Sequence, residues 1–378
     1  MNKETEKQQI FRNACRDFLH KEAIPQINDW ESNGIIDKSF WLKAGKAKML
    51  GIGVAENFGG QGESDYHYPL IVIEEMLKSG VDVPGFVSHN DVTASYIATL
   101  GNDSQKQRWL PALCSGELIA AIAVTEPDGG SDTTNIKTQA VLQGDHYLVN
   151  GCKSYITNGI NADLVVTAVK TSQQEQGRGI SLLVIERGLD GFTRGENYKK
   201  LGWPASDNSA LYFKDCRVPK ENLLGRENLG NAYFMGAMPR ERLSIACVAV
   251  VFAELIFQQT LNYVKHRQAF GQAIGHFQHN RFLLAQLDTE LKIARIYLES
   301  SIDKFNKNQL SVVEAAQVKL WTTELQFKVA DHCLQLHGAS GYLQDSPIGK
   351  AWSTSRVQKI YGGTSEILKE IISKSLGL

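Results

Sequence analysis

The spacing of apolar residues changes twice along the chain. From residue 5 to about 116, apolar positions recur every three or four residues, which is typical of helices with one buried face. Pro25 is expected to end or bend the first helix, and Asn102 is expected to cap a later one. The helices predicted after the first span 69–78, 91–100 and 105–113. This part of the chain is therefore predicted to be helical.

Short apolar runs replace the helical spacing from about residue 118. They are rich in Val, Ile, Leu and Tyr, and turn residues such as Gly144 and Asp145 separate them. The strands predicted on this basis are 118–124, 139–142, 146–149, 164–169, 180–185 and 210–213. Short strands at such close spacing predict an antiparallel sheet or barrel.

The helical spacing returns after Gly230 and continues to the end of the chain. Long helices are predicted over 233–266, 277–306, 312–336 and 364–376. Pro239 lies inside the first of these and is expected to kink or restart it. The predicted fold class is α+β: an N-terminal helical domain at 1–117, a middle antiparallel β domain (barrel or sandwich) at 118–229, and a C-terminal four-helix bundle at 230–378.

Charge and cysteine usage argue against several classes of function. The chain has 40 basic and 41 acidic side chains and a net charge of −1, so nucleic acid is not an expected ligand. The six cysteines form no Cys-x-x-Cys pair, which argues against zinc and disulfides and favours a reducing compartment. The charged start at 1–7 does not resemble a signal peptide, and the apolar stretch 245–257 is too short for a membrane span. We expect a cytoplasmic protein without membrane contact or a metal site.

Five short segments carry the residue types that ligand sites use. The first is 361–366, Tyr-Gly-Gly-Thr-Ser-Glu, where a glycine pair precedes a helix start and permits close approach of a ligand. Alone, such a pair is more often a simple turn. The other segments are 124–132, 154–159, 267–271 followed by Gln278, and 335–338. A further glycine loop at 59–62 is interpreted as a surface connection, because no Gly-Lys-Ser/Thr sequence accompanies it after a strand.

In order and spacing, these segments resemble the acyl-CoA dehydrogenases, a family of FAD flavoenzymes, over essentially the whole chain. The motifs at 267–272 and 275–278 are similar to those of the isovaleryl-CoA dehydrogenase branch. The resemblance implies FAD as the cofactor. It implies flavin contacts from Val124, Thr125, Ser131, Tyr155 and Thr157, and adenosine diphosphate contacts from Thr364 and Glu366. It further implies contacts to the FAD of a neighbouring subunit from Arg267, Phe270, Gln278, Gln335 and Gly338.

The residue types agree with that reading. A planar flavin needs an aromatic wall, hydroxyls at its polar edge and a cation near its pyrophosphate, and Tyr155, Thr157 and Arg267 are of these types. Taken singly, each has an ordinary structural explanation as a core aromatic, a strand hydroxyl or a solvated helix end. The combination in this order is what favours a flavin site.

The reaction implied by the resemblance needs a base. It forms a 2,3-double bond in an acyl thioester, with a carboxylate removing the α proton and flavin N5 taking the β hydride. Medium-chain members carry the glutamate directly before Gly-Thr-Ser, where this chain has Gly362. Isovaleryl and long-chain members carry it in a Glu-Arg-Leu motif, which is Glu241-Arg242-Leu243 here. We assign Glu241 as the base, in preference to a surface carboxylate paired with Arg240 or Arg242.

The substrate contacts implied by the resemblance are Ser131, Arg242, Tyr361 and Gly362, whose N–H would polarise the thioester carbonyl. The chain departs from the family pattern at Asp128, where a small residue is common, and at 353–355, which replace Arg-Asp-Ala. His89 is equally well explained as a satisfied polar residue and as a substrate contact.

The partners implied are a coenzyme A thioester, an electron-transferring flavoprotein and further copies of the chain in a homotetramer, a dimer of dimers. One alternative keeps the fold but takes an acyl, aminoacyl or hydroxyacyl group on a carrier protein, with oxygen as the acceptor. A second alternative is a flavin-binding assembly partner without catalysis, against which the presence of Glu241 argues.

Overall fold

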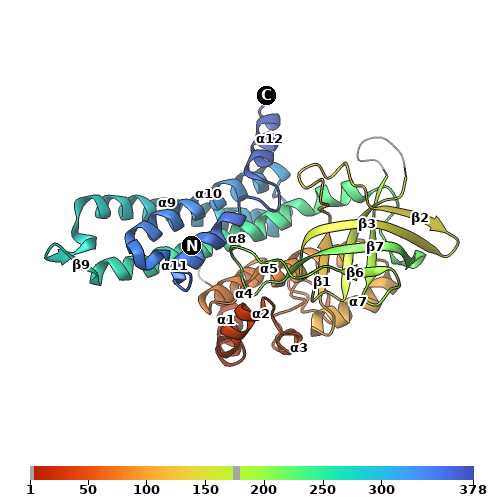
Figure 1. Cartoon of the computed structure of the whole chain (residues 1–378), viewed down its shortest axis with the longest axis horizontal. Helices are drawn as coiled ribbons and strands as arrows, with labels where there is room; N and C mark the ends of the chain where they lie inside the picture. The colour runs from red at the N-terminus through yellow and green to blue at the C-terminus, as the bar shows by residue number, and fades with distance from the viewer. Residues whose placement is uncertain (1–3, 173–178) are drawn as a thin grey trace. The chain divides into compact units, whose positions relative to one another are not determined.

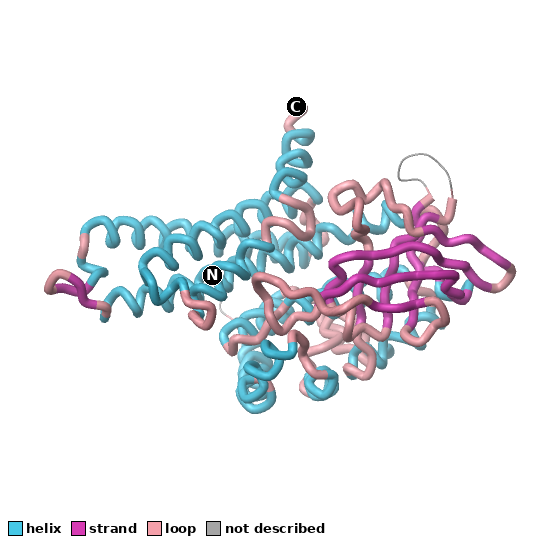
Figure 2. Tube along the Cα trace, viewed as in Figure 1, coloured by secondary structure: helices cyan, strands magenta, loops and turns pink. Residues whose placement is uncertain are grey.

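The computed structural model describes residues 4–172 and 179–378, so the first three residues of the charged start at 1–7 lie outside it. The chain divides into two compact units, Thr5–Ala237 and Met238–Leu378. In Figure 2 the large sheet belongs to the first unit, whereas the second is helical apart from one small hairpin. The boundaries drawn at 117 and 229 from the sequence stay a prediction.

The N-terminal part of the first unit is helical, as predicted. Capping boxes at Thr5 and Asn102 start the first and last of its helices, and Pro25 lies in a 3₁₀ turn (Ile24–Gln26) just after the first helix ends. The segment expected as one helix over 91–100 is instead a π-helix, Ser88–Thr93, continued by an α-helix. The α-helices are α1 (Glu6–Glu22), α2 (Ile27–Asn33), α3 (Lys38–Lys46), α4 (His67–Lys78), α5 (Pro84–Val87), α6 (Ala94–Leu100) and α7 (Asp103–Ser115).

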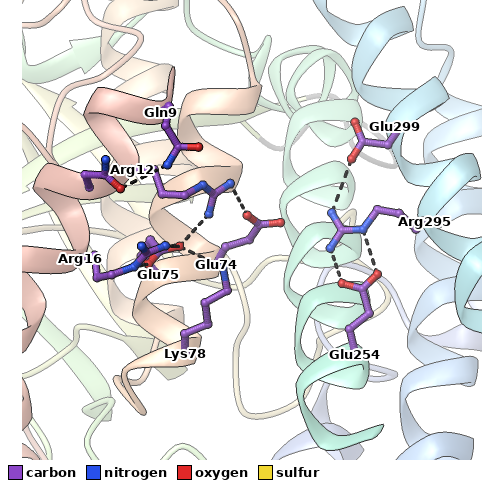
Figure 3. A network of polar contacts seen from close by, with 10 residues as sticks. Gln9, Arg12, Arg16, Glu74, Glu75, Lys78, Glu254, Arg295 and Glu299 are labelled. Carbon is purple, nitrogen blue, oxygen red and sulfur yellow. Dashed lines mark hydrogen bonds and ion pairs between the residues drawn. The ribbon is translucent and has the colours of Figure 1, made fainter. Parts of the chain in front are cut away.

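A buried carboxylate ties α1 to α4 (Figure 3). Glu75 on α4 accepts hydrogen bonds from Arg12 Nη1 at 2.7 Å, from Arg16 Nε at 2.8 Å and from Lys78 Nζ at 2.9 Å. Burial opposes the charge of Glu75, but these bonds outweigh it and lower the pKa of the carboxyl to about 2. The helical layer is thus fixed by a charge network as well as by apolar packing.

The sheet of the first unit is predominantly antiparallel. Its strands follow the order β6-β7-β3-β2-β4-β5-β8, and β1 pairs with β4. The β1–β4 pairing is parallel, and so is the short contact of β2 with β4, so the sheet is mixed. The pattern of short strands gave no sign of these parallel pairs or of β6 and β8. The strands are β1 (Ala120–Ala123), β2 (Gln139–Gln143), β3 (His146–Thr157), β4 (Leu164–Lys170), β5 (Ile180–Glu186), β6 (Phe192–Arg194), β7 (Asn208–Pro219) and β8 (Leu223–Leu224).

Strands β4 and β5 pair with each other near the β8 end of the sheet and are buried on both faces. Val166 and Leu182 pack with Trp109 of α7 in one apolar cluster. Val165 and Leu183 point the other way and pack with residues of β3 and β7 in a second cluster. This alternation follows from the two-residue period of a strand and fixes the register of the edge that carries β1 and β3.

The second unit contains the long C-terminal helices. Pro239 does not restart α8, which is one continuous helix, and α11 was not predicted. Helix α10 contacts α9, α11 and α12, so it lies at the centre of the unit. The elements are α8 (Gly230–His266, which begins in the first unit), β9 (Gln268–Ala269), β10 (Gln272–Ala273), α9 (Gln278–Asn306), α10 (Val312–His337), α11 (Pro347–Val357) and α12 (Ser365–Ser375), labelled in Figure 1 where space allows.

Helix α8 contains a long apolar stretch. Among the described residues it is the one helix whose length and hydropathy would suffice to cross a membrane, and 72% of its apolar window is buried within the protein. Such burial is characteristic of a core helix. Arg295 of α9 donates a hydrogen bond from Nε to the carboxylate of Glu254 on α8, at 2.9 Å. Arg295 also pairs with Glu299 (Figure 3). This ion network joins the two helices.

Candidate functional site

The segment that follows β1 is held against β3 by a buried lysine. Lys153 is fully buried, and its Nζ donates to the carbonyl of Val124 at 3.0 Å and to Glu126 Oε1 at 2.8 Å. Glu126 also accepts the backbone N–H groups of Lys137 and Thr138, at 2.7 and 2.9 Å. Burial lowers the pKa of Lys153 to about 8, against the attraction of Glu126. The positions of Val124 and the residues after it therefore rest on an ion pair that the sequence did not reveal.

Several predicted flavin contacts lie together at this edge of the sheet. The N–H of Ser154 donates to the carbonyl of Thr125 at 2.9 Å, which brings Thr125 beside the end of β3. Tyr155 follows at a register irregularity of β3 against β7, with a left-handed φ of 59°. Its ring is 67% exposed and lies 5.5 Å from that of Tyr198. Thr157 ends the same strand, whereas Ser131 is exposed on the loop beyond Gly130.

An exposed hairpin in the second unit carries the next predicted group. Arg267 follows the end of α8, and Phe270 and Gly271 form the two-residue turn between β9 and β10, with φ values of 52° and 78°. Positive φ at both positions is the geometry of a tight hairpin turn. The Phe270 ring is 94% exposed, and Gln278 is exposed at the start of α9. Gln335 and Gly338, at the end of α10, are exposed as well.

The backbone of the glycine pair at the start of α12 disfavours side chains. Gly362 and Gly363 have φ values of 65° and 94°, in the left-handed region that favours glycine. A Cβ atom on Gly362 would lie 2.2 Å from Cδ1 of Ile245 on α8. Thr364 caps α12 by accepting the N–H of Ile367 at 3.3 Å, and Glu366 is exposed in the first turn. The helix-start chemistry predicted for 361–366 is confirmed.

Two buried cations face the carbonyls of the glycine pair. Arg242 Nε donates to the carbonyl of Gly362 at 3.5 Å, and its Nη1 donates to that of Val312 at the same distance. Lys319 on α10 is fully buried, and its Nζ donates to the carbonyl of Gly363 at 2.8 Å. Burial, together with the charge of Arg242, lowers the pKa of Lys319 to about 7. Sequence reasoning missed Lys319, because a lysine two residues after Gln317 looks like an ordinary polar position on a helix.

Glu241 lies one turn before Ile245 on α8, so the two side chains share a face of the helix. Ile245 touches the position of Gly362, and Glu241 is therefore close to the glycine pair within the second unit. Arg240 lies over the ring of Phe305, 5.7 Å from the centroid, and Arg242 reaches the two carbonyls described above while the charge of Glu241 acts on it. Glu241 itself is half-buried.

Tyr361 and His89 each have hydrogen-bond partners within their own units. The hydroxyl of Tyr361 donates to Gln358, and burial raises the pKa of the phenol. His89 is fully buried, with Nε2 donating to the carbonyl of Leu113 at 3.1 Å and Nδ1 accepting the N–H of Ala120 at 3.0 Å. Both ring nitrogens are occupied, so the explanation of His89 as a satisfied polar residue holds. No group of three or more His, Cys, Asp or Glu side chains within the described ranges is arranged to bind a metal.

The fold and these sites define a three-part flavin dehydrogenase. Matches to family descriptions cover almost the whole chain: "Acyl-CoA dehydrogenase, N-terminal domain" at 5–117, the middle domain at 121–216 and the C-terminal domain at 228–377. The chain belongs to the acyl-CoA dehydrogenase family. It is therefore a flavin oxidoreductase that acts on CH–CH groups and uses FAD.

Individual relatives are similar over nearly their full length. The long-chain specific acyl-CoA dehydrogenase of Sus scrofa mitochondria is 41% identical over 97% of this chain and 86% of its own. The isovaleryl-CoA dehydrogenase of Pongo abelii is 32% identical over 98% and 89%. An acyl-CoA dehydrogenase structure from Geobacillus kaustophilus has a TM-score of 0.97 at 44% identity, covering 99% of each chain. The prolyl acyl carrier protein oxidase AnaB has a TM-score of 0.90 at 29% identity, covering 100% of each.

The residues present fit a flavin. An exposed aromatic ring, Tyr155, stands beside the hydroxyl residues Thr125 and Thr157 on one edge of the sheet, as a flat ring with a polar rim requires. Exposed aromatic and cationic groups at Phe270 and Arg267 are likewise suited to a cofactor, rather than to the core of their own unit.

Proposed function

We propose that this protein oxidises the Cα–Cβ bond of an acyl-coenzyme A thioester, with Glu241 as the base. The observation that carries the assignment is steric. A side chain at Gly362 is disfavoured, because its Cβ would lie 2.2 Å from Cδ1 of Ile245 and its backbone has a φ of 65°. Glu241 is the carboxylate one turn from Ile245 on the same face of α8.

In this mechanism Glu241 removes the proton from Cα of the substrate. Negative charge then develops on the thioester oxygen, and the N–H of Gly362 donates a hydrogen bond to it. Within residues 4–172 and 179–378 no partner is found for that N–H, so it is available for the oxygen. When bound, FAD supplies the two-electron acceptor for the hydride that leaves Cβ. Val124, Thr125, Ser131, Tyr155 and Thr157 would hold it from one subunit.

Residues of the second unit would bind the remainder of the cofactor. Thr364 and Glu366 would contact its adenosine diphosphate part. Arg267, Phe270, Gln278, Gln335 and Gly338 would reach the FAD of a neighbouring subunit. We infer on this basis a homotetramer, a dimer of dimers, in which a neighbouring subunit's FAD would cover the exposed ring of Phe270. Sedimentation of the Phe270→Ser protein tests it, since loss of assembly and of FAD together is expected.

Replacing the base tests the reaction. The Glu241→Gln protein should bind FAD and acyl-CoA, yet bleach its flavin anaerobically at least 10²-fold more slowly, in the range for loss of a general base. Glu254→Gln, on the same helix, is the matched control and should bleach at the rate of the unmodified protein. Rapid bleaching by Glu241→Gln would refute the assignment.

A carrier-protein thioester is the second candidate substrate, favoured by the similarity to AnaB and by the exposed Asp128, which pairs with Lys137 at 2.8 Å. The same acyl group offered on coenzyme A and on a carrier protein separates the two. Electrons would pass to an electron-transferring flavoprotein in the cytoplasm, or to oxygen under the carrier-protein alternative. A protein that contains FAD but reacts with no thioester would indicate the assembly-partner alternative.

A further inference from the structure

We infer that Lys319 is a positioning residue that fixes the Gly362–Gly363 loop, and through it the N–H that receives the thioester oxygen. The inference rests on the proposed function and names a residue that the mechanism above does not use. Its basis is a fully buried ammonium group that donates to a backbone carbonyl of that loop at 2.8 Å.

A buried lysine normally has a carboxylate partner. Lys153 has Glu126 within 2.8 Å, but no ion pair within 4.0 Å is found for Lys319 among the described residues. Its surroundings are instead a second cation, Arg242 on α8, and two more distant carboxylates, Glu324 on α10 and Glu366 on α12. Because the charge is disfavoured at this position, its direct contact with Gly363 is the feature that requires an explanation.

The loop needs such an anchor because glycine does not hold its own conformation. Two consecutive glycines can adopt many backbone angles, and nothing local selects the φ values of 65° and 94°. Anchors beyond the pair are present: Ser365 Oγ donates to Glu324 at 2.7 Å, and Glu324 pairs with Lys359 at 2.6 Å. These bonds fix the start of α12 but not the peptides of the glycines themselves.

Lys319 and Arg242 complete the restraint. Arg242 holds the carbonyl of Gly362 only at 3.5 Å, whereas Lys319 holds that of Gly363 at 2.8 Å. The shorter, charge-assisted bond is the stronger restraint. The carbonyl of Gly363 lies in the peptide that ends at Thr364, two peptides after the one that carries the N–H of Gly362. Lys319 therefore acts on that N–H by fixing one end of the two-glycine segment, which leaves fewer backbone angles free to reorient it. Removal of Lys319 should therefore displace the amide without deleting it.

The experiment compares Lys319→Met with Lys328→Met, which removes a half-buried lysine from the same helix whose partner is Glu290 of α9 and not the glycine loop. Two readouts are used: steady-state turnover, and the infrared carbonyl stretch of bound, ¹³C-labelled 2,2-dimethylpropanoyl-CoA. This thioester has no α proton and stays intact. For Lys319→Met we expect kcat to fall at least tenfold with KM nearly unchanged, and the stretch to return toward its value in water. Lys328→Met should match the unmodified protein in both.

Folding is controlled by FAD content and thermal unfolding. Should Lys319→Met fail to fold, Lys319→Gln decides by the same readouts, because it keeps a shorter, uncharged N–H donor and should give an intermediate shift. An unchanged stretch and kcat in a folded variant would overturn the inference. The proposed function fails separately, if the unmodified protein oxidises no thioester.

Discussion

The contact between Gly362 and Ile245 predicts a specific energetic coupling. Gly362→Ala places a methyl group 2.2 Å from Cδ1 of Ile245, but 3.8 Å from Cγ1. Ile245→Val removes Cδ1 alone, so in that background the new methyl group meets only an ordinary van der Waals contact. The two substitutions therefore separate steric conflict from backbone strain.

The magnitudes follow from the geometry. An alanine at φ 65° costs about 1–2 kcal/mol in backbone strain. The conflict with Cδ1 adds about 1–3 kcal/mol, as for overpacking of a core. Ile245 is buried, so Ile245→Val alone should cost about 1 kcal/mol. The double variant should lose only about 2–3 kcal/mol, less than the sum of the two single losses.

Equilibrium urea unfolding measures the coupling, with FAD in excess and at one protein concentration, since ligand and assembly both contribute to stability. Losses that add within about 0.5 kcal/mol would refute the reasoning, because independent sites behave in that way. Additivity would mean that Ile245 does not fill the space beside Gly362. The steric argument for Glu241 as the base would then be lost.

Two buried titratable groups give further predictions. Burial lowers the pKa of His89 from 6.5 to about 4. As the pH falls, the unfolded chain therefore binds a proton at His89 before the folded protein does. The stability contributed by neutral His89 is lost as the pH falls from 6.5 to about 4. Urea unfolding at pH 7 and pH 5 should show a loss of about 2 kcal/mol that His89→Gln abolishes; an unchanged pH difference in the variant contradicts this. Lys153→Met leaves Glu126 buried without its cation and should cost about 3–5 kcal/mol and most of the bound FAD, by absorbance at constant protein. The double variant with Glu126→Gln should recover part of the loss, whereas no recovery would contradict the ion-pair account.

Much of the fold could be predicted because its elements have strong local signals. Caps at Asn102 and Thr364 fix the starts of α7 and α12 through hydrogen bonds made within four residues. Both helix starts could therefore be predicted from the local sequence. The hairpin at Gly144 and Asp145 was equally local. The parallel pairing of β1 with β4 was not predictable, since it joins residues more than 40 apart and leaves no local pattern. Helix α11 was missed although its start has local signals: Ser346 accepts the N–H of Gly349, and Pro347 is the first helical residue.

The candidate site likewise contains residues that the sequence predicted and residues that it did not. Tyr155 and Thr125 lie in segments recognisable by order and spacing, and the structure brings them together at one sheet edge. Lys319 and Ile245 were not identified, because the first looks like a polar position on a helix and the second like any core residue. Their importance depends on contacts with Gly363 and Gly362, more than 40 residues away. Such contacts are set by the packing of α8 and α10 against the glycine loop.

The same packing explains how base and amide can be supplied by different elements. A loop that bears the carboxylate must have a side chain at position 362, and a side chain there excludes a long residue at 245. In this chain Ile245 fills the space beside Gly362, and Gly362 offers only its amide. Glu241 lies one turn before Ile245 on the same helix. The loop then has no side chain to hold it, so its two carbonyls need outside donors, and Arg242 and Lys319 are those donors. Under the proposed mechanism, a buried lysine beside an arginine is thus a consequence of locating the base on α8.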